Sequence, residues 1–412
     1  MSIGTPPQEF EVHLDTGSSD LWLNVASSDF CTTTETCDTG TYNANSSSTY
    51  EYVNSRFEIS YVDDSSSAGD YVRDTVRLTD SNITLPGQQF GVGYESSTSD
   101  AILGIGYPTN EVQVSRGGQI YPNIPVSLVN EGFISSLTYS LWLNNISADE
   151  GSILFGGVNT AKYQGELTTL PVIPTNGIYR EFTIAMTGVG LNGDDAERFS
   201  GSGSWNVHLD SGASLTYLPE SIANSIYAYT GARYDATVGA ALLDCDKQSS
   251  PDTIDFRFTE EAATIRVPMS EMVIPYAQLG GELVCTLGIL PAIAAERREY
   301  LILGDTFLRS AYVVYDMERH TVGMAQTVFG DVEDHVVEIG AEGERPTGTA
   351  GDGAAPAASN FVAPPGGGGS GSGGGGGSGS GGETGEESAG SRVVESWSLV
   401  AVVAVSAAMV CI

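Results

Sequence analysis

A seven-residue segment near the start of the chain recurs in its second half. Residues 12–18 read Val-His-Leu-Asp-Thr-Gly-Ser, and residues 207–213 read Val-His-Leu-Asp-Ser-Gly-Ala. The period is far too long for a solenoid repeat, so it predicts two copies of one domain, each bringing one carboxylate, Asp15 or Asp210, to a shared site. Two carboxylates held together cannot both ionise, so one keeps its proton at acid pH. Such a pair holds an acid and a base and can activate water.

A second pair of similar segments follows the two copies. Residues 101–106 read Ala-Ile-Leu-Gly-Ile-Gly, and residues 300–305 read Tyr-Leu-Ile-Leu-Gly-Asp. Each aspartate is thus followed, further along the chain, by two apolar residues and a glycine. A glycine there lets another strand or loop cross closely over the backbone. The duplication therefore includes the packing around the motif.

The chain is strongly acidic. It has 17 Lys and Arg against 52 Asp and Glu, and its formal net charge is -35. Nucleic acid is excluded as a partner, because phosphate binding requires a basic face. The acidity either keeps the protein soluble or indicates a working pH near the sequence pI of 4.1, where many carboxylates are protonated and repel each other less.

Residues 1–327 have the pattern of an all-β protein. Short stretches that alternate or are rich in β-branched and aromatic residues, such as 9–12 and 311–315, are separated by Gly, Pro, Asn and Ser. Helical pattern is confined to residues 126–131 and 220–230. From residue 328 the apolar periodicity stops, and residues 366–382 are only Gly and Ser. Such a stretch cannot bury enough surface to offset its chain entropy, so residues 328–396 are predicted to be a disordered stalk.

The last 16 residues, 397–412, form an almost wholly apolar tail. A membrane span requires about 20 residues, and no basic residue follows to stop transfer. Small residues at 388–391, a polar stretch and an apolar end together predict a glycolipid-anchor signal that is cut away. The alternative is a marginal single-span anchor. Cys411 lies in this tail.

Cysteines and sequons indicate secretion. Four of the five cysteines lie within 1–327, which favours two local disulfides in an oxidising compartment. No Cys/His spacing typical of zinc occurs, so no metal is expected. Three Asn-x-Ser/Thr sequons are glycosylation candidates, at Asn45, Asn82 and Asn145. The start at Met1 has no signal-peptide pattern, so we expect the chain to lack its true N-terminus.

These motifs together resemble the pepsin family of aspartic proteases over nearly all of residues 1–327. The matching segments are Ile3-Gly4-Thr5-Pro6-Pro7-Gln8, 15–22 (Asp-Thr-Gly-Ser-Ser-Asp-Leu-Trp), 102–104 (Ile-Leu-Gly), 210–212 (Asp-Ser-Gly) and 302–309 (Ile-Leu-Gly-Asp-Thr-Phe-Leu-Arg). The resemblance implies an all-β, bilobal fold with two pseudo-symmetric lobes, 1–163 and 164–327, and the active-site cleft between them. The stalk and tail are similar to those of the fungal cell-surface branch called yapsins.

The resemblance also implies roles for single residues. Asp15 and Asp210 match the catalytic pair that holds the attacking water. Thr16 and Ser211 match hydroxyls that cross-bond beneath the pair, and Ser18 matches an outer hydroxyl that bonds the first Asp. The support residues of the pair are thus Thr16, Gly17, Ser18, Ser211 and Gly212.

Further matches concern the flap and the disulfides. Tyr61 matches the tyrosine of a flap hairpin that closes over substrate, and Trp22 matches its hydrogen-bonding partner; without the family both would be assigned to the core. Cys31–Cys37 and Cys245–Cys285 fall where the family places disulfides. A pepsin-like mechanism needs no cofactor. It implies polypeptide substrates, pepstatin-like inhibitors and a monomer.

The chain departs from the family pattern at two places near the pair and the flap. Ala213 stands where the family has Thr or Ser, so the second carboxylate lacks one donor and its neutral form is favoured. Val62 replaces a flap glycine, and Asp63 lies two residues after the flap Tyr61. An acidic residue there is associated in the family with a basic substrate residue before the cut. The alternative is that the acidic flap tip is only a solvated loop.

His13 and His208 each lie two residues before an aspartate of the pair. Alternation along a strand puts i and i+2 on one face, where the family has apolar residues facing substrate. Either these are partly buried histidines bonded to backbone, or they are paired cations that help keep the pair ionised and favour acidic or polar substrate side chains.

The leading hypothesis is therefore an acid endopeptidase at the outer face of the plasma membrane or cell wall, held by a glycolipid anchor, that processes secreted or wall proteins. A catalytically dead wall or binding protein with the same fold is the second hypothesis, and the intact Asp15, Asp210, Tyr61 and Ser18 argue against it. A Ser-His-Asp hydrolase is a third, but the chain has no Gly-x-Ser-x-Gly elbow.

Overall fold

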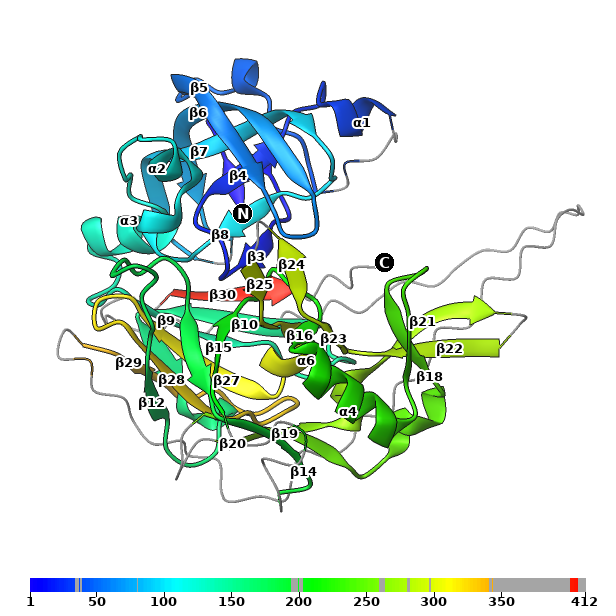
Figure 1. Ribbon diagram of the computed structural model, residues 1–412. Coiled ribbons are helices and arrows are strands. Elements are labelled where there is room, and N and C mark those ends of the chain that lie inside the picture. The colour runs from blue at the N-terminus through cyan, green and yellow to red at the C-terminus, as the bar shows by residue number, and fades with distance from the viewer. Residues whose placement is uncertain are drawn as a thin grey trace, which may run out of the picture.

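The chain folds into two β-rich halves that meet at the repeated motifs, as a computed structural model shows (Figure 1). The structure describes residues 1–33, 37, 39–79, 81–193, 199, 203–258, 264–279, 282–295, 298–340, 343 and 401–406. In Figure 1 the blue and cyan strands form the upper half, and most green and yellow strands form the lower one. Within these ranges no helix is long and apolar enough to cross a membrane.

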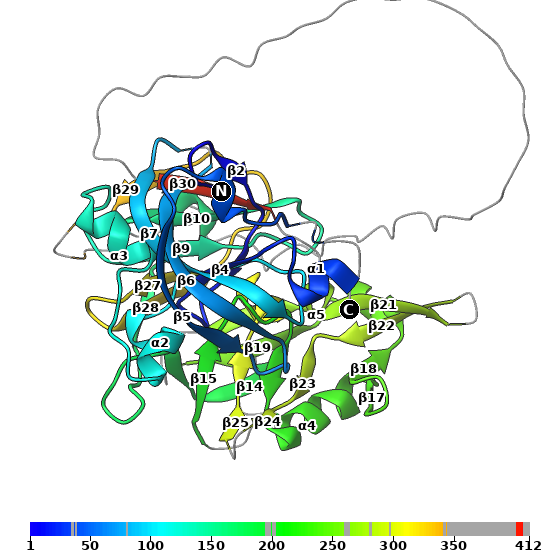
Figure 2. The same cartoon turned by 90° about the horizontal axis from the view of Figure 1, so that it is seen from above.

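An eight-stranded sheet builds the first half. It has the order β2-β1-β6-β7-β4-β8-β3, and β5 pairs with β6. β5 and β6 form a long hairpin that is visible from above in Figure 2. The strands are β1 (Ser2–Ile3), β2 (Gln8–Glu9), β3 (His13–Asp15), β4 (Leu21–Asn24), β5 (Glu51–Ser60), β6 (Ser66–Arg77), β7 (Thr84–Ser96) and β8 (Ile102–Gly104).

A six-stranded sheet joins the two halves, because its strands come from both. Strands from the first half lie in it beside strands from the end of the second half, and β30 pairs with the β10 edge along six residues. In sheet order the strands are β12 (Thr168–Pro171), β28 (Thr321–Gln326), β27 (Ala311–Asp316), β9 (Thr138–Trp142), β10 (Glu150–Phe155) and β30 (Ala401–Ser406).

The second half contains smaller sheets. The first carries the second copy of the repeat and has the order β13 (Thr183–Met186), β15 (Trp205–Leu209), β26 (Ile302–Leu303), β16 (Thr216–Leu218) and β23 (Ile289–Pro291). A three-stranded sheet has the order β14 (Gly188–Leu191), β19 (Thr253–Arg257) and β20 (Thr264–Pro268). A four-stranded sheet has the order β17 (Arg233–Asp235), β18 (Ala240–Leu243), β22 (Glu282–Leu287) and β21 (Val273–Leu279). A two-stranded sheet pairs β24 (Ile293–Ala295) with β25 (Arg298–Tyr300).

The described helices are short, and α1, α2, α3 and α4 lie at the periphery of the molecule (Figure 1). α4 is the longest and ends at Gly231, whose left-handed φ of 83° suits a residue without a side chain. One apolar face of α4, including Ile222 and Ile226, is buried. The helices are α1 (Asp29–Thr33), α2 (Val112–Ser115), α3 (Ile124–Asn130), α4 (Glu220–Thr230), α5 (Met269–Met272) and α6 (Asp305–Leu308).

Residues 331–340, which we call the C-terminal strap, fold back from the second half onto the first. β29 (Val336–Glu338) in this strap pairs with β11 (Gly157–Asn159). Ile339 is fully buried against Trp142 and Tyr312. The predicted stalk boundary at residue 328 is therefore too early, because part of the strap is paired and packed. Most of the predicted stalk, and the predicted tail except 401–406, lie outside the described residues.

Candidate active site

The two repeated aspartates sit at equivalent ends of equivalent strands. β3 ends at Asp15 and pairs in parallel with β8, whereas β15 ends just before Asp210 and pairs in parallel with β26. The main chain repeats this symmetry, since His13 N donates to Ala101 O over 2.7 Å and His208 N donates to Leu301 O over 2.9 Å. The second pair of apolar-apolar-Gly segments thus fixes where both aspartates emerge.

Two glycines allow the carboxyl groups to approach each other. A Cβ atom on Gly17 would lie 2.5 Å from Cγ of Asp210, and one on Gly212 would lie 2.6 Å from Oδ1 of Asp15. These separations are far below van der Waals contact, so any side chain there would push the two loops apart. The glycines of both copies are therefore required for a shared carboxyl site.

Reciprocal hydrogen bonds hold the two loops beneath the pair. Thr16 N donates to Ser211 Oγ over 3.2 Å, and Ser211 N donates to Thr16 Oγ1 over 3.0 Å. Each hydroxyl in turn donates across the symmetry axis, from Thr16 to Leu209 O over 3.0 Å and from Ser211 to Leu14 O over 2.8 Å. All four partners are buried, so these bonds are shielded from competing water. The structure thus brings Thr16 and Ser211 together beneath Asp15 and Asp210.

The two carboxyl groups have unequal surroundings. Oδ1 of Asp15 accepts from Gly17 N at 2.7 Å and from Ser18 N at 3.2 Å, and the Ser18 hydroxyl donates to Oδ2. Oδ1 of Asp210 accepts from Gly212 N at 2.9 Å. Ala213 offers only a methyl group where Ser18 offers a hydroxyl. The ionised form is thus better solvated by the protein at Asp15 than at Asp210.

Burial, together with the negative charge of Asp15, raises the pKa of Asp210 well above its ordinary value. Asp305, further along the chain, adds a smaller effect in the same direction. Asp210 is therefore favoured in its protonated form, whereas more hydrogen-bond donors surround the carboxyl group of Asp15. This arrangement supplies a general acid and a general base in one site.

The β5–β6 hairpin carries the predicted flap tyrosine. Its tip spans residues 61–65, and Trp22 Nε1 donates to the Tyr61 hydroxyl over 2.7 Å. Burial, and then the charge of Asp15, raises the pKa of Tyr61 well above its ordinary value. Tyr61 thus stays protonated and within electrostatic reach of the pair.

Comparison with known proteins identifies the family. A sequence profile described as "Eukaryotic aspartyl protease" matches residues 1–327. The chain belongs to this family. The protein is an aspartic-type endopeptidase, and similar proteins carry this activity in their names.

Two relatives illustrate the similarity. "Probable aspartic-type endopeptidase opsB" of Aspergillus oryzae is 44% identical over 373 residues, which cover 88% of this chain and 73% of that protein. "Candidapepsin-3" of Candida albicans is 36% identical over 343 residues, which cover 80% of this chain and 79% of that protein.

The fold matches a solved structure. An aspartic proteinase from Irpex lacteus superposes with a TM-score of 0.65 at 22% identity, covering 80% of this chain and 93% of that one. The predicted all-β, bilobal pepsin-like fold of this aspartyl protease is thereby confirmed.

The two histidines beside the pair have different surroundings in this protease. His208 is buried, and its Nδ1 lies 2.8 Å from Thr183 Oγ1 and 3.3 Å from Glu181 Oε2. Its Nδ1 therefore contacts two side chains of the same lobe. His13 is partly exposed, and its charge opposes the burial that raises the pKa of Asp305 to about 6.

Asp63 lies exposed at the tip of the flap. Its Oδ1 accepts from Ser65 N over 3.0 Å and from the Ser65 hydroxyl over 2.7 Å, so it also closes the turn. Burial, and then the negative charge of Asp63, raises the pKa of Tyr217 on β16, in the opposite half of the protease. The flap tip therefore faces the second lobe.

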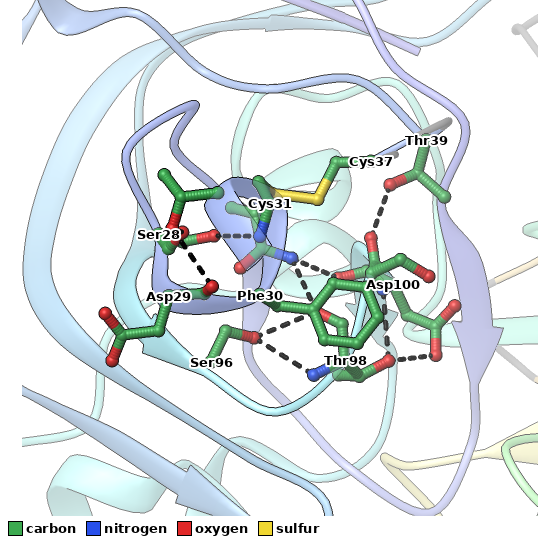
Figure 3. Close-up of a disulfide and its surroundings, with 12 residues drawn as sticks. Ser28, Asp29, Phe30, Cys31, Cys37, Thr39, Ser96, Thr98 and Asp100 are labelled. Atoms are coloured by element: carbon green, nitrogen blue, oxygen red, sulfur yellow. Dashed lines mark hydrogen bonds between the residues drawn. A yellow bond between two sulfur atoms is a disulfide. The ribbon is translucent and has the colours of Figure 1, made fainter. Parts of the chain in front are cut away.

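Both implied disulfides are formed. Cys31–Cys37 closes the loop after α1, where Cys31 N donates to Ser28 Oγ over 3.3 Å (Figure 3). Thr39, just beyond this disulfide, donates to Ser99 O over 2.8 Å. Cys245–Cys285 joins segments separated by 40 residues in the second half. Each disulfide therefore constrains a peripheral part of one lobe.

The three glycosylation candidates lie at the surface. Asn45 and Asn82 are exposed, and Asn145 is partly exposed in the loop between β9 and β10. Within the described ranges, no group of three or more His, Cys, Asp or Glu side chains could hold a metal ion.

The sequence reasoning missed several acidic and polar residues near the pair and the flap. Asp20 and Asp305 lay inside quoted motifs, so their positions were available even though no role was assigned. No local sequence pattern marked the other three residues, which come close to the aspartate pair or the flap only when the chain folds. The missed residues are Asp20, Glu111, Glu181, Thr183 and Asp305.

Proposed function

We propose that Asp15 and Asp210 hydrolyse peptide bonds through a shared proton. Ionised Asp15 takes a proton from the attacking water, while protonated Asp210 donates its proton to the oxygen of the peptide carbonyl. The product of this step is a gem-diol without a covalent bond to the enzyme. The unequal donor sets of the two carboxyls support this assignment. The protons belong to the pair, so both pKa values are properties of the pair.

Cleavage of a denatured protein at pH 4, with and without pepstatin, tests this proposal. Asp210→Asn keeps the shape of the side chain but cannot supply the acid proton, so kcat/KM should fall by about 10³-fold. Asp331→Asn removes an exposed carboxyl remote from the pair and should leave kcat/KM unchanged. Cleavage that persists in Asp210→Asn or resists pepstatin would contradict the proposal.

We further propose that Asp63 favours Lys or Arg on the N-terminal side of the cut. Its charge lies at the flap tip and acts across to Tyr217, so a basic side chain bound between flap and second lobe would meet it. Both contacts of Asp63 with Ser65 use one oxygen, Oδ1. An amide oxygen could accept the same bonds, so charge and turn geometry are separable.

Asp63→Asn should therefore preserve the flap and remove only the charge. We expect kcat/KM for a peptide with Lys before the cut to fall about tenfold, with little change for a matched Leu peptide. Asp64→Asn is the control: Asp64 is also exposed and has a φ of 67°, a conformation that asparagine tolerates. Equal kinetics of Asp63→Asn and wild type on the Lys peptide would refute the specificity proposal.

The enzyme is proposed to act outside the cell, in a yapsin-like anchored form. Two disulfides, three surface sequons and relatives such as "Secreted aspartic protease 3" of Candida albicans, 36% identical, support an extracellular location. The apolar tail supports a glycolipid anchor. A phosphatidylinositol-specific phospholipase should release the enzyme from intact cells, whereas a membrane-spanning anchor would leave it bound.

A further inference from the structure

Asp20 belongs to the first catalytic motif but serves a different part of the molecule. It is fully buried. Its Oδ1 accepts from the hydroxyls of Tyr71, at 2.7 Å, and Tyr121, at 2.8 Å, and its Oδ2 accepts from Val112 N at 2.9 Å. The carboxyl group of Asp20, directly before β4, thus joins that strand to β6, to the start of α2 and to Tyr121.

Glu111 brings a second carboxyl group into the same place. The residue is 1% exposed, and Oε2 accepts from Tyr121 N over 3.0 Å. Oε1 is buried and has no hydrogen-bond partner among the described residues. Burial, and to a smaller extent the charge of Asp20, raises the pKa of Glu111 to about 9. The group is therefore protonated at acid pH, and the fold provides no donor for a second charged oxygen.

These carboxyls border the small core that supports the flap. This flap-root cluster consists of buried Trp22, Phe57, Ile59, Tyr71 and Tyr121, and Tyr61 and Val112 pack against it. Asp20 bonds two of its tyrosines, and Trp22 bonds the hydroxyl of Tyr61. A change at Glu111 thus reaches this cluster through Tyr121, whose amide donates to Glu111 and whose hydroxyl donates to Asp20.

The charged and titratable neighbours of the two carboxyls are acids and phenols. Tyr61 from the flap, Tyr71 from β6 and Tyr121 from the segment before α3 interact electrostatically with Asp20, and Tyr71 and Tyr121 also with Glu111. Asp15 acts on Tyr61. Arg116 at the end of α2 pairs instead with exposed Glu58 on β5. None of the interactions found for either carboxyl is with a cation.

We propose that Glu111, next to Asp20, is a positioning residue that locks the flap root in place while it carries a proton, and that its ionisation as the pH rises releases the flap and inactivates the enzyme. This lock rests on the proposed function, because the flap must close over a substrate. A second buried negative charge beside Asp20, with Oε1 unpaired, can be solvated only if residues 107–123 move outwards. That movement breaks the bonds of Asp20 to Val112 and Tyr121.

The direction of the pH effect follows from linkage. The pKa of Glu111 is about 4.5 in an unfolded chain and about 9 in the fold, so the folded state binds more protons between these values. The contribution of Glu111 to stability is complete below about pH 4.5 and is lost progressively as the pH rises towards 9.

Glu111→Gln tests the lock, because glutamine has nearly the same shape and never ionises. Enzyme is incubated from pH 3 to 9, returned to pH 4 and assayed, and kcat/KM is measured across the same range. We expect the pH of half-inactivation to rise by at least about one unit, with kcat/KM at pH 4 within about twofold of wild type. Glu131→Gln, which removes an exposed carboxyl at the end of α3, should behave as wild type.

Hydrogen exchange provides a readout that does not require activity. After correction for the intrinsic pH dependence, residues 107–123 and the flap should exchange faster in wild type as the pH rises, but not in Glu111→Gln. If Glu111→Gln does not fold, Glu111→Met, which also stays neutral, replaces it. Inactivation at the wild-type pH in the neutral variant, or exchange independent of pH in wild type, would overturn the lock. Loss of cleavage at pH 4 in wild type would instead refute the proposed function.

Discussion

A hydroxyl group is one of the differences between the surroundings of the two carboxyls. Ser18 donates to Asp15, and Ala213 has no equivalent donor for Asp210. Ala213→Thr should supply that donor, lower the pKa of Asp210 and move the pH–rate profile towards acid by less than about one unit. The pH dependence of kcat/KM measures this shift.

Ala213→Val is the matched control, because valine has the shape of threonine without the hydroxyl. Its profile should stay at the wild-type position. An unchanged profile in Ala213→Thr, or an equal shift in Ala213→Val, would show that the missing donor does not set the pH optimum.

At the scale of residues, the sequence predicted those contacts that local motifs carry. The repeat predicted that Asp15 and Asp210 share one site, and the resemblance to the pepsin family implied that Thr16 and Ser211 bond beneath them. Glu111 could not be found in this way. A lone glutamate beside a short helix has the pattern of a solvated residue, and its burial depends on distant side chains that fold over it.

Among the elements, β26 crosses the turn after Asp210 at backbone contact. A Cβ atom on Gly304 would lie 2.2 Å from Ala213 O and 2.4 Å from Leu215 O. These main-chain oxygens cannot rotate away as the end of a flexible side chain can, so Gly304→Ala should lower the free energy of unfolding by about 3 kcal/mol or more. Urea unfolding followed by tryptophan fluorescence measures the loss.

Gly340→Ala provides the comparison, since a Cβ atom at Gly340 meets nothing within 4 Å. Its free energy of unfolding should lie within about 0.5 kcal/mol of wild type. Similar stabilities of the two variants would mean that the close crossing of β26 is not rigid.

The elements that the sequence predicted are those with local signals. The helix expected at 220–230 is α4, because an amphipathic pattern ends at Gly231. The helix expected at 126–131 begins two residues earlier, since Pro125 fits the first turn of α3. β29 was missed because its three residues are too few to show a period and pair with β11, which lies far away in the sequence.

For the whole molecule, the C-terminal strap connects the end of the second lobe to the first. Asp334 Oδ1 accepts from Asn159 Nδ2 over 2.7 Å and lies 3.6 Å from Lys162 Nζ, and Ile339 N donates to Gly156 O over 2.8 Å. Ile339→Ala should lower the free energy of unfolding by about 2–4 kcal/mol, because its side chain is fully buried. Thermal or urea unfolding measures the change.

Val336→Ala in the same strand is the control. Val336 is 38% exposed, so its truncation should change the free energy of unfolding by no more than about 0.5 kcal/mol. If both variants equal wild type, the strap does not contribute to the folded unit and the stalk boundary expected at residue 328 stands.

The inequality of the two repeated loops has a consequence for the direction of the substrate. In a site with perfect twofold symmetry, a polypeptide could lie with its N-terminus towards either lobe at equal energy. Ser18 in one loop and Ala213 in the other remove that equivalence, because the proposed base, Asp15, and the proposed acid, Asp210, then lie on fixed sides. A protein with two identical halves would leave the choice to the peptide. Here, the difference between Ser18 and Ala213 favours one of the two directions in which a peptide could bind.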